Sequence, residues 1–126
     1  HGSTFGGNPL AATVALEALN ILFDENLIQR AEELGDYLYQ HLLKISSPLI
    51  KEIRGKGLFI GVELDSRYAK GRDIVLQLLE HGLLSYETHD TVIRLAPPLI
   101  ISKEQLDEAL TILKKVLLAN TAKIRA

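Results

Sequence analysis

The sequence predicts an α/β domain in which a long helical arm precedes a small sheet with helices packed against it. Three observations support this fold class. Apolar residues recur at helical spacing between positions 10 and 42. Short apolar runs bounded by glycine and proline follow between positions 50 and 98, as is typical of strands. Helical spacing then returns from position 106 to position 117.

The composition excludes several classes of function. With 126 residues, of which 47% are hydrophobic and 24% charged, the chain suits one compact domain. A net charge of -2, with dispersed lysines and arginines, argues against a nucleic-acid partner. Cysteine is absent and the four histidines are scattered, so we expect no disulfide and no metal site.

The apolar stretches are too short to cross a bilayer, and no signal peptide is visible, so we expect a cytoplasmic protein without a membrane partner. The chain lacks methionine and starts with His1. We therefore expect it to be a segment of a longer protein.

The first 45 residues are expected to form a loop and two helices. Asn8 is a typical helix cap, and Pro9 suits the first helical position. The alanine-rich helix that follows could pack closely against another element. A break near residues 23–25 separates it from a second, amphipathic helix, which ends at the Ser-Ser-Pro segment, residues 46–48.

The middle of the chain alternates strands and turns. A sharp turn is expected at the Gly-Lys-Gly segment, residues 55–57, and a helix C-cap at Gly82. The expected elements are an extended piece at 50–54, strands at 58–64, 83–86 and 92–95, and a helix at 71–80.

The last helix is predicted from a capping box. Ser102 and Gln105 have the spacing in which each side chain bonds the backbone N–H of the other. The prolines at 97 and 98 interrupt regular structure before it. Residues 121–126 are expected to be a frayed tail.

Two segments could carry chemistry. The glycine-rich loop before Asn8 offers the hydroxyls of Ser3 and Thr4 and the N–H groups of a helix N-terminus, which together could bind an anion. Taken alone, this loop is better interpreted as a flexible lead, because the Gly-Lys-Ser/Thr of a phosphate-binding P-loop is missing. Lys56 lies in a glycine turn, where a solvated ammonium is expected rather than a catalytic amine.

Arg94 is the second candidate. It stands between two aliphatic residues in a predicted strand, and its planar guanidinium could bind a carboxylate with two hydrogen bonds. A solvent-facing position, or an internal salt bridge to an acid such as Glu63, explains the same pattern equally well. The neighbouring His89 and Asp90 are interpreted as parts of a polar hairpin, not as an acid–base pair.

Three motifs taken together resemble class III aminotransferases, which use pyridoxal phosphate. They are HGSTFGGNPLA at residues 1–11, RGKGLFIGVE at 54–63 and IRLAPPL at 93–99. Their order and spacing match that family across nearly the whole chain. Residues 87–98, which include most of the third motif, resemble the ornithine branch of the family more closely than the acetylornithine, 4-aminobutyrate or glutamate-semialdehyde branches. The fold that the resemblance implies is the α+β small domain, with a mostly antiparallel sheet, found at the C-terminus of fold-type I aminotransferases.

The resemblance also implies an activity. It is the transfer of the δ-amino group of ornithine to 2-oxoglutarate, with glutamate 5-semialdehyde and glutamate as products, in a homodimeric enzyme. By the same resemblance Thr4, with Ser3 as a weaker candidate, contacts the cofactor phosphate of the other subunit, and Arg94 holds a substrate carboxylate. Residues 1–45 then form the phosphate loop and an interdomain arm, and residues 46–126 form the small domain.

The resemblance has one large gap. The family's cofactor-binding lysine precedes the first motif, so no residue of this chain is expected to be catalytic, and the chain alone is expected to be inactive. Two alternatives stay open. The substrate could be acetylornithine or that of another class III enzyme, or the chain could be a non-catalytic dimerisation or interaction domain.

Overall fold

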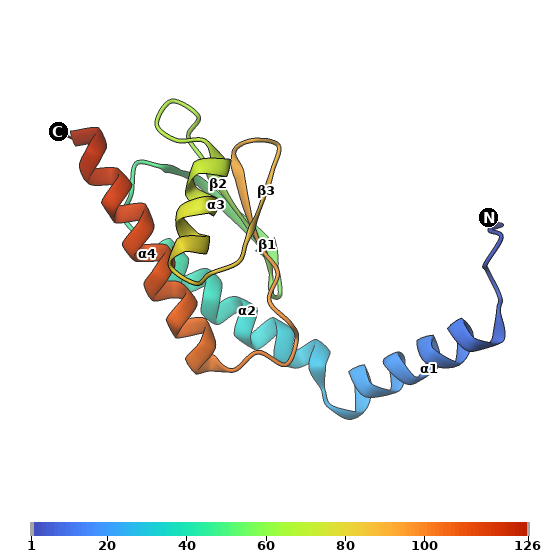
Figure 1. Ribbon diagram of the computed structural model, residues 1–126. Helices are drawn as coiled ribbons and strands as arrows, with labels where there is room; N and C mark the ends of the chain where they lie inside the picture. Colours follow the sequence, from blue (N-terminus) through green and yellow to red (C-terminus); the bar gives the residue numbers. More distant parts are fainter. Residues whose placement is uncertain (1, 126) are drawn as a thin grey trace.

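The computed structural model describes residues 2–125, which form four helices and one four-stranded sheet (Figure 1). His1, in the first motif, and Ala126, in the expected tail, lie outside the described residues. The elements in chain order are α1 Pro9–Asp24, α2 Leu27–Leu43, β1 Ile50–Lys56, β2 Phe59–Leu64, α3 Gly71–Glu80, β3 Tyr86–Thr88, β4 Val92–Leu95 and α4 Lys103–Arg125.

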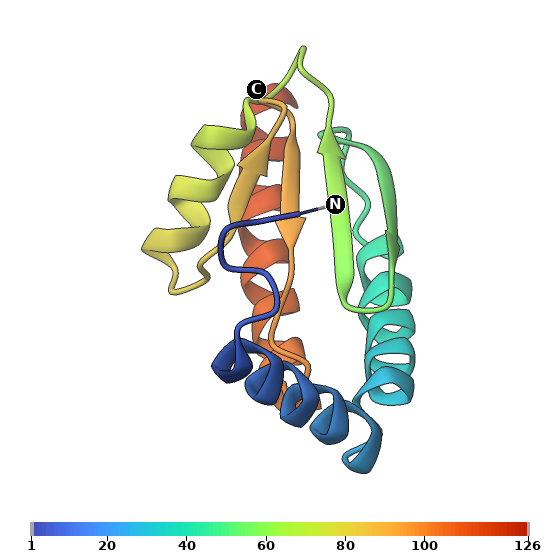
Figure 2. The same ribbon diagram turned by 90° about the vertical axis from the view of Figure 1, so that its right-hand side faces the viewer.

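The sheet has the strand order β1-β2-β4-β3, and all neighbouring strands are antiparallel. Helices α2, α3 and α4 lie against one face of it, and no element within residues 2–125 covers the other face (Figures 1 and 2). The predicted fold class is therefore confirmed. The molecule has two layers, and the sheet has one open face.

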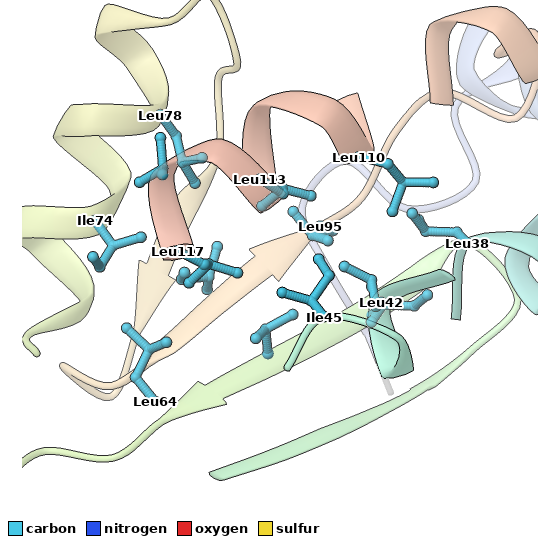
Figure 3. Close-up of a cluster of buried hydrophobic side chains, with 14 of the residues drawn as sticks. Leu38, Leu42, Ile45, Leu64, Ile74, Leu78, Leu95, Leu110, Leu113 and Leu117 are labelled. Atoms are coloured by element: carbon cyan, nitrogen blue, oxygen red, sulfur yellow. The ribbon is translucent and has the colours of Figure 1, made fainter. Parts of the chain in front are cut away.

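The core lies between the sheet and the three helices (Figure 3). Alternation along β2 turns Ile60 and Val62 toward the helices, where both are almost fully buried. Leu38 and Leu42 of α2 belong to the same cluster, as does Leu117 of α4. Burying each such side chain contributes roughly 1.5–3 kcal/mol, so this cluster fixes which face of each strand is left for other contacts.

Helix α1 projects from this core (Figure 1). It begins as predicted, since Asn8 Oδ1 accepts a hydrogen bond from the Ala11 N–H at 2.9 Å and Pro9 occupies the first position. None of its residues is buried, and the side chains of Leu10 and Phe23 are 76% and 66% exposed. A packing partner for this apolar helix is therefore not found within residues 2–125.

The strand predicted at 83–86 is displaced along the chain. Helix α3 ends at Glu80 with His81 as its C-cap, one residue before the predicted cap Gly82, which has a φ of +89°. The Leu83 N–H donates to the Leu78 carbonyl at 2.9 Å. Because the Leu83 N–H is used in this bond at the end of the helix, it is not available to pair with a neighbouring strand. The strand therefore begins at Tyr86, and it turns back through His89 and Asp90, which both have positive φ.

The tail prediction is wrong. Helix α4 begins with the predicted capping box, in which the Ser102 N–H donates to Gln105 Oε1 and the Gln105 N–H to Ser102 Oγ. It then continues to Arg125. Thr121 is only 5% exposed, and its hydroxyl lies 2.7 Å from Ser47 Oγ. This contact with the loop before β1 keeps the last turns ordered, and the sequence pattern did not indicate it.

Candidate functional site

Arg94 lies on the open face of the sheet, in a row that crosses all four strands. The register places Arg54 of β1 opposite Gly61 of β2, Gly61 opposite Arg94 of β4, and Arg94 opposite Tyr86 of β3. Because side chains of directly paired residues point to the same face, the four positions share the open face. The neighbours of Arg94 in β4 are buried on the opposite face, whereas Arg94 itself is exposed.

A depression of about 390 Å³ borders Arg94 on this face. Gly61 contributes no side chain to it, while its neighbours in the row do, so the glycine leaves room between two guanidinium groups. Phe59 adds an apolar wall, and Thr88 and His89 border it from the hairpin. The lining residues are Arg54, Gly55, Phe59, Ile60, Gly61, Thr88, His89, Val92 and Arg94.

The charges around the depression are distributed unequally. Glu63 Oε1 lies 2.7 Å from Lys51 Nζ, and its Oε2 lies 2.6 Å from Arg54 Nη1. The hydrogen bonds from Lys51 and Arg54 hold the pKa of the Glu63 carboxyl below its ordinary value. The Glu63 carboxylate in turn raises the pKa of Lys51. Arg54 and Glu63 thus neutralise each other. The proposed alternative in which Glu63 pairs with Arg94 is not what the structure shows.

Arg94 has a different neighbour. Its guanidinium carbon lies 5.4 Å from the centroid of the Tyr86 ring, and no acid among residues 2–125 forms a salt bridge with it. An arginine with an aromatic ring on one side and an open depression on the other can still donate hydrogen bonds from the edges of its guanidinium. A carboxylate is the group that fits those donors.

The second candidate segment, the loop around Ser3 and Thr4, folds back on itself. The Gly6 N–H donates to the Ser3 carbonyl at 3.3 Å. A Cβ added to Gly6 would lie 2.7 Å from Ser3 Oγ, so this hydroxyl lies close to the Gly6 backbone. Both Ser3 and Thr4 are exposed. Hydroxyl donors, small residues and the N-terminus of α1 together fit a phosphate group.

The two candidate segments are not brought together within this chain. The loop lies at the far end of α1, away from the sheet, although on the side toward which the open face is turned (Figures 1 and 2). The loop and the open face of the sheet therefore lie toward the same side of the molecule without forming one site within this chain.

Sequence reasoning missed Tyr86 and Gly61 as neighbours of Arg94, because their relation depends on strand register. The glycine turn between Arg54 and Gly61 predicts that the segments on its two sides form a hairpin. It does not predict that β4, which carries Arg94, pairs with the second strand of that hairpin. Within residues 2–125 no group of three or more histidine, aspartate or glutamate side chains could hold a metal ion. None of the described helices is both long and apolar enough to cross a membrane.

Comparison with known proteins shows what this arrangement resembles. The family described as Aminotransferase class-III matches residues 1–117. The ornithine aminotransferase of Staphylococcus carnosus is 60% identical over 92% of the chain, and the match spans 28% of that protein. The chain thus spans less than a third of the relative's length.

Solved aminotransferase structures share the fold, including those of two enzymes that are similar in sequence to the chain. The ornithine aminotransferase from Toxoplasma gondii is 46% identical to the chain, and its structure matches with a TM-score of 0.92. That structure is reported with partial occupancy of PLP at its active site. The match covers 100% of this chain and 30% of that one. The acetylornithine aminotransferase of Elizabethkingia anophelis is 43% identical, with a TM-score of 0.84 over 94% of this chain and 32% of its own.

Proposed function

Because this chain belongs to the class III aminotransferases, we propose that it is the C-terminal part of an ornithine aminotransferase. The observation that carries the proposal is the 60% identity to an ornithine aminotransferase over 92% of the chain. The proposed reaction transfers the δ-amino group of ornithine to 2-oxoglutarate and yields glutamate 5-semialdehyde and glutamate. Acetylornithine is the second candidate substrate, since an acetylornithine aminotransferase shares the fold at 43% identity.

The proposed cofactor is pyridoxal 5'-phosphate, which supplies an electron sink when it is bound. The part of this chain that would hold it is the loop before α1. The Thr4 hydroxyl and the N–H groups of the loop would donate to the phosphate, and Ser3 would serve as the weaker donor. The lysine that binds the cofactor covalently is proposed to belong to the part of the enzyme that the chain does not span. The chain alone is therefore proposed to be inactive.

Arg94 is proposed to hold a substrate carboxylate. Its guanidinium has no acidic partner among residues 2–125 and borders a depression. The salt bridges of Glu63 support this role. Because Lys51 and Arg54 bind the Glu63 carboxylate, Glu63 does not compete with a substrate carboxylate for the Arg94 guanidinium. A carboxylate that enters the depression can then take both edge donors of Arg94.

The arm is proposed to reach across a dimer. Helix α1 exposes apolar side chains and carries the loop away from the sheet, so Thr4 can serve the site of a second subunit. The proposed division is into an arm, residues 1–45, and a small domain, residues 46–126. Helix α2 joins the two parts, since Leu38 and Leu42 lie in the core.

The proposed substrate is tested by assaying the full-length enzyme with ornithine and with N-acetylornithine. We expect a higher kcat/KM with ornithine, with 2-oxoglutarate as the amino acceptor. Detection of glutamate 5-semialdehyde as the product would identify the δ-amino group as the one transferred. A preference for N-acetylornithine would favour the second candidate, and activity with neither amine would contradict the proposed function.

The proposed phosphate contact is tested by Thr4→Val in the full-length enzyme. Valine keeps the shape of threonine and removes the hydroxyl donor, so we expect the Kd for pyridoxal phosphate to rise by roughly 10-fold, as for a lost hydrogen bond to a charged group. Thr4→Ser restores the hydroxyl and is the matched control, with a Kd expected near that of the wild type. Titration followed by absorbance measures both, and equal Kd values for Thr4→Val and the wild type would contradict the contact.

A further inference from the structure

The residue that faces Arg94 from β3 has no role in the function proposed above. Tyr86 is directly opposite Arg94 in the pairing of β3 with β4, and the residue is 59% exposed. The ring contributes little to the core, which lies on the other face of the sheet. The structure therefore offers no packing reason for a large aromatic side chain at this position.

The contact of Tyr86 with Arg94 has a clear geometry. The ring stands on one side of the guanidinium, at 5.4 Å from its carbon, whereas the Tyr86 side chain does not line the depression on the other side. Gly61, the other neighbour of Arg94 in the row, has no side chain with which to support the guanidinium. Tyr86 is thus its only lateral support among the described residues of the row.

Arginine has a long side chain that loses conformational entropy when it binds a ligand. The free energy gained from its hydrogen bonds to the ligand must offset this loss. A ring that attracts the guanidinium reduces this loss before the ligand arrives, because the side chain is already restricted. The attraction involves the aromatic face, so the N–H edges of the guanidinium remain free to donate toward the depression.

We infer that Tyr86 is a positioning residue, which holds the Arg94 guanidinium toward the depression over Gly61 and so strengthens the binding of a substrate carboxylate. This inference rests on the proposed function of Arg94. Tyr86 itself does not touch the substrate, and its phenolic hydroxyl is not needed. The support comes from the aromatic ring.

The chain contains a matched control for this contact. Arg67 Cζ lies 5.3 Å from the ring centroid of Tyr68, which is 43% exposed. Asp65 already binds Arg67 through a salt bridge, and neither Arg67 nor Tyr68 lines the depression beside Arg94. Removing the Tyr68 ring therefore removes the same kind of contact at a place where no substrate is expected.

The experiment measures KM and kcat of the full-length enzyme for ornithine and for 2-oxoglutarate. We expect Tyr86→Leu to raise KM for the substrate whose carboxylate Arg94 binds by about 3- to 10-fold, with kcat changed less than KM. Tyr86→Phe should restore the wild-type KM, since phenylalanine keeps the ring. Tyr68→Leu should leave both constants unchanged. Tyr86→Thr repeats the test with a second residue that lacks a ring and favours strands, and melting temperatures verify that each variant folds.

Arg94→Ala separates the inference from the function on which it rests. In that background Tyr86→Leu should have no further effect on KM, because the support acts only through Arg94. An unchanged KM in Tyr86→Leu, together with a raised KM in Arg94→Ala, would overturn the inference and leave the proposed function standing. An unchanged KM in Arg94→Ala would overturn the role of Arg94 itself. Equal effects of Tyr86→Phe and Tyr86→Leu would also contradict support by the ring.

Discussion

Replacing Arg94 with alanine in the full-length enzyme is expected to lower kcat/KM by about 10²- to 10³-fold, mainly through a higher KM for the substrate carboxylate. The reason is the loss of two charge-assisted hydrogen bonds in a depression whose other lining arginine is already bound by an acid. The nearest guanidinium across Gly61 is that of Arg54, which is held by Glu63 at 2.6 Å. Steady-state kinetics with each substrate measure the effect.

Two variants serve as controls. Arg94→Lys keeps the positive charge but loses the planar pair of donors, so its kcat/KM is expected to lie between those of the wild type and of Arg94→Ala. Arg67→Ala removes an exposed arginine that is bound to Asp65, and it should leave the kinetics unchanged. If KM in Arg94→Ala equals that of the wild type, the sheet face is not a substrate site. The alternative of a non-catalytic interaction domain would then be favoured.

The second large effect concerns stability. Gly35→Ala is expected to lower the free energy of unfolding by about 3 kcal/mol, although alanine in a helix interior is ordinarily favoured over glycine by about 1 kcal/mol. Gly35 of α2 is buried against the turn between β1 and β2. A Cβ at this position would overlap the carbonyl carbon and oxygen of Gly57, and these backbone atoms cannot rotate away as a side chain could.

Thermal unfolding of the full-length enzyme measures this effect as a lower melting temperature. Gly2→Ala is a suitable control, because a Cβ there meets no atom within 4 Å, and its melting temperature should match that of the wild type. A melting temperature of Gly35→Ala at or above that of the wild type would contradict the close approach of α2 to the β1–β2 turn.

Predictions that depend on neighbouring residues in the sequence were confirmed. The cap at Asn8 and the box formed by Ser102 and Gln105 each need partners only three residues away, so the sequence contains the whole interaction. Helical spacing likewise located α1, α2, α3 and α4, since a period of 3.6 residues is a local property.

Two predictions failed where a hydrogen bond that the apolar pattern does not indicate decides the outcome. The tail was expected to fray, but Thr121 contacts Ser47, 74 residues away. The strand expected from Leu83 starts at Tyr86, because the end of α3 uses the Leu83 N–H. The Thr121–Ser47 contact exists only after the helices and the sheet have packed together. The Leu83 N–H, by contrast, binds the Leu78 carbonyl within the end of α3, and the apolar pattern of residues 83–86 did not indicate this local bond.

The sequence by itself determined the fold class, the helix ends with their caps, and the candidates Ser3, Thr4 and Arg94. It left open whether Arg94 pairs with Glu63, because any two residues on the same face of a sheet can be neighbours until the register is known. The tertiary structure decided this through the order β1-β2-β4-β3, which places Gly61 and Tyr86 beside Arg94 and leaves Glu63 to Lys51 and Arg54. Strand register depends on which faces bury their side chains against the helices, and that is a property of the whole packed core.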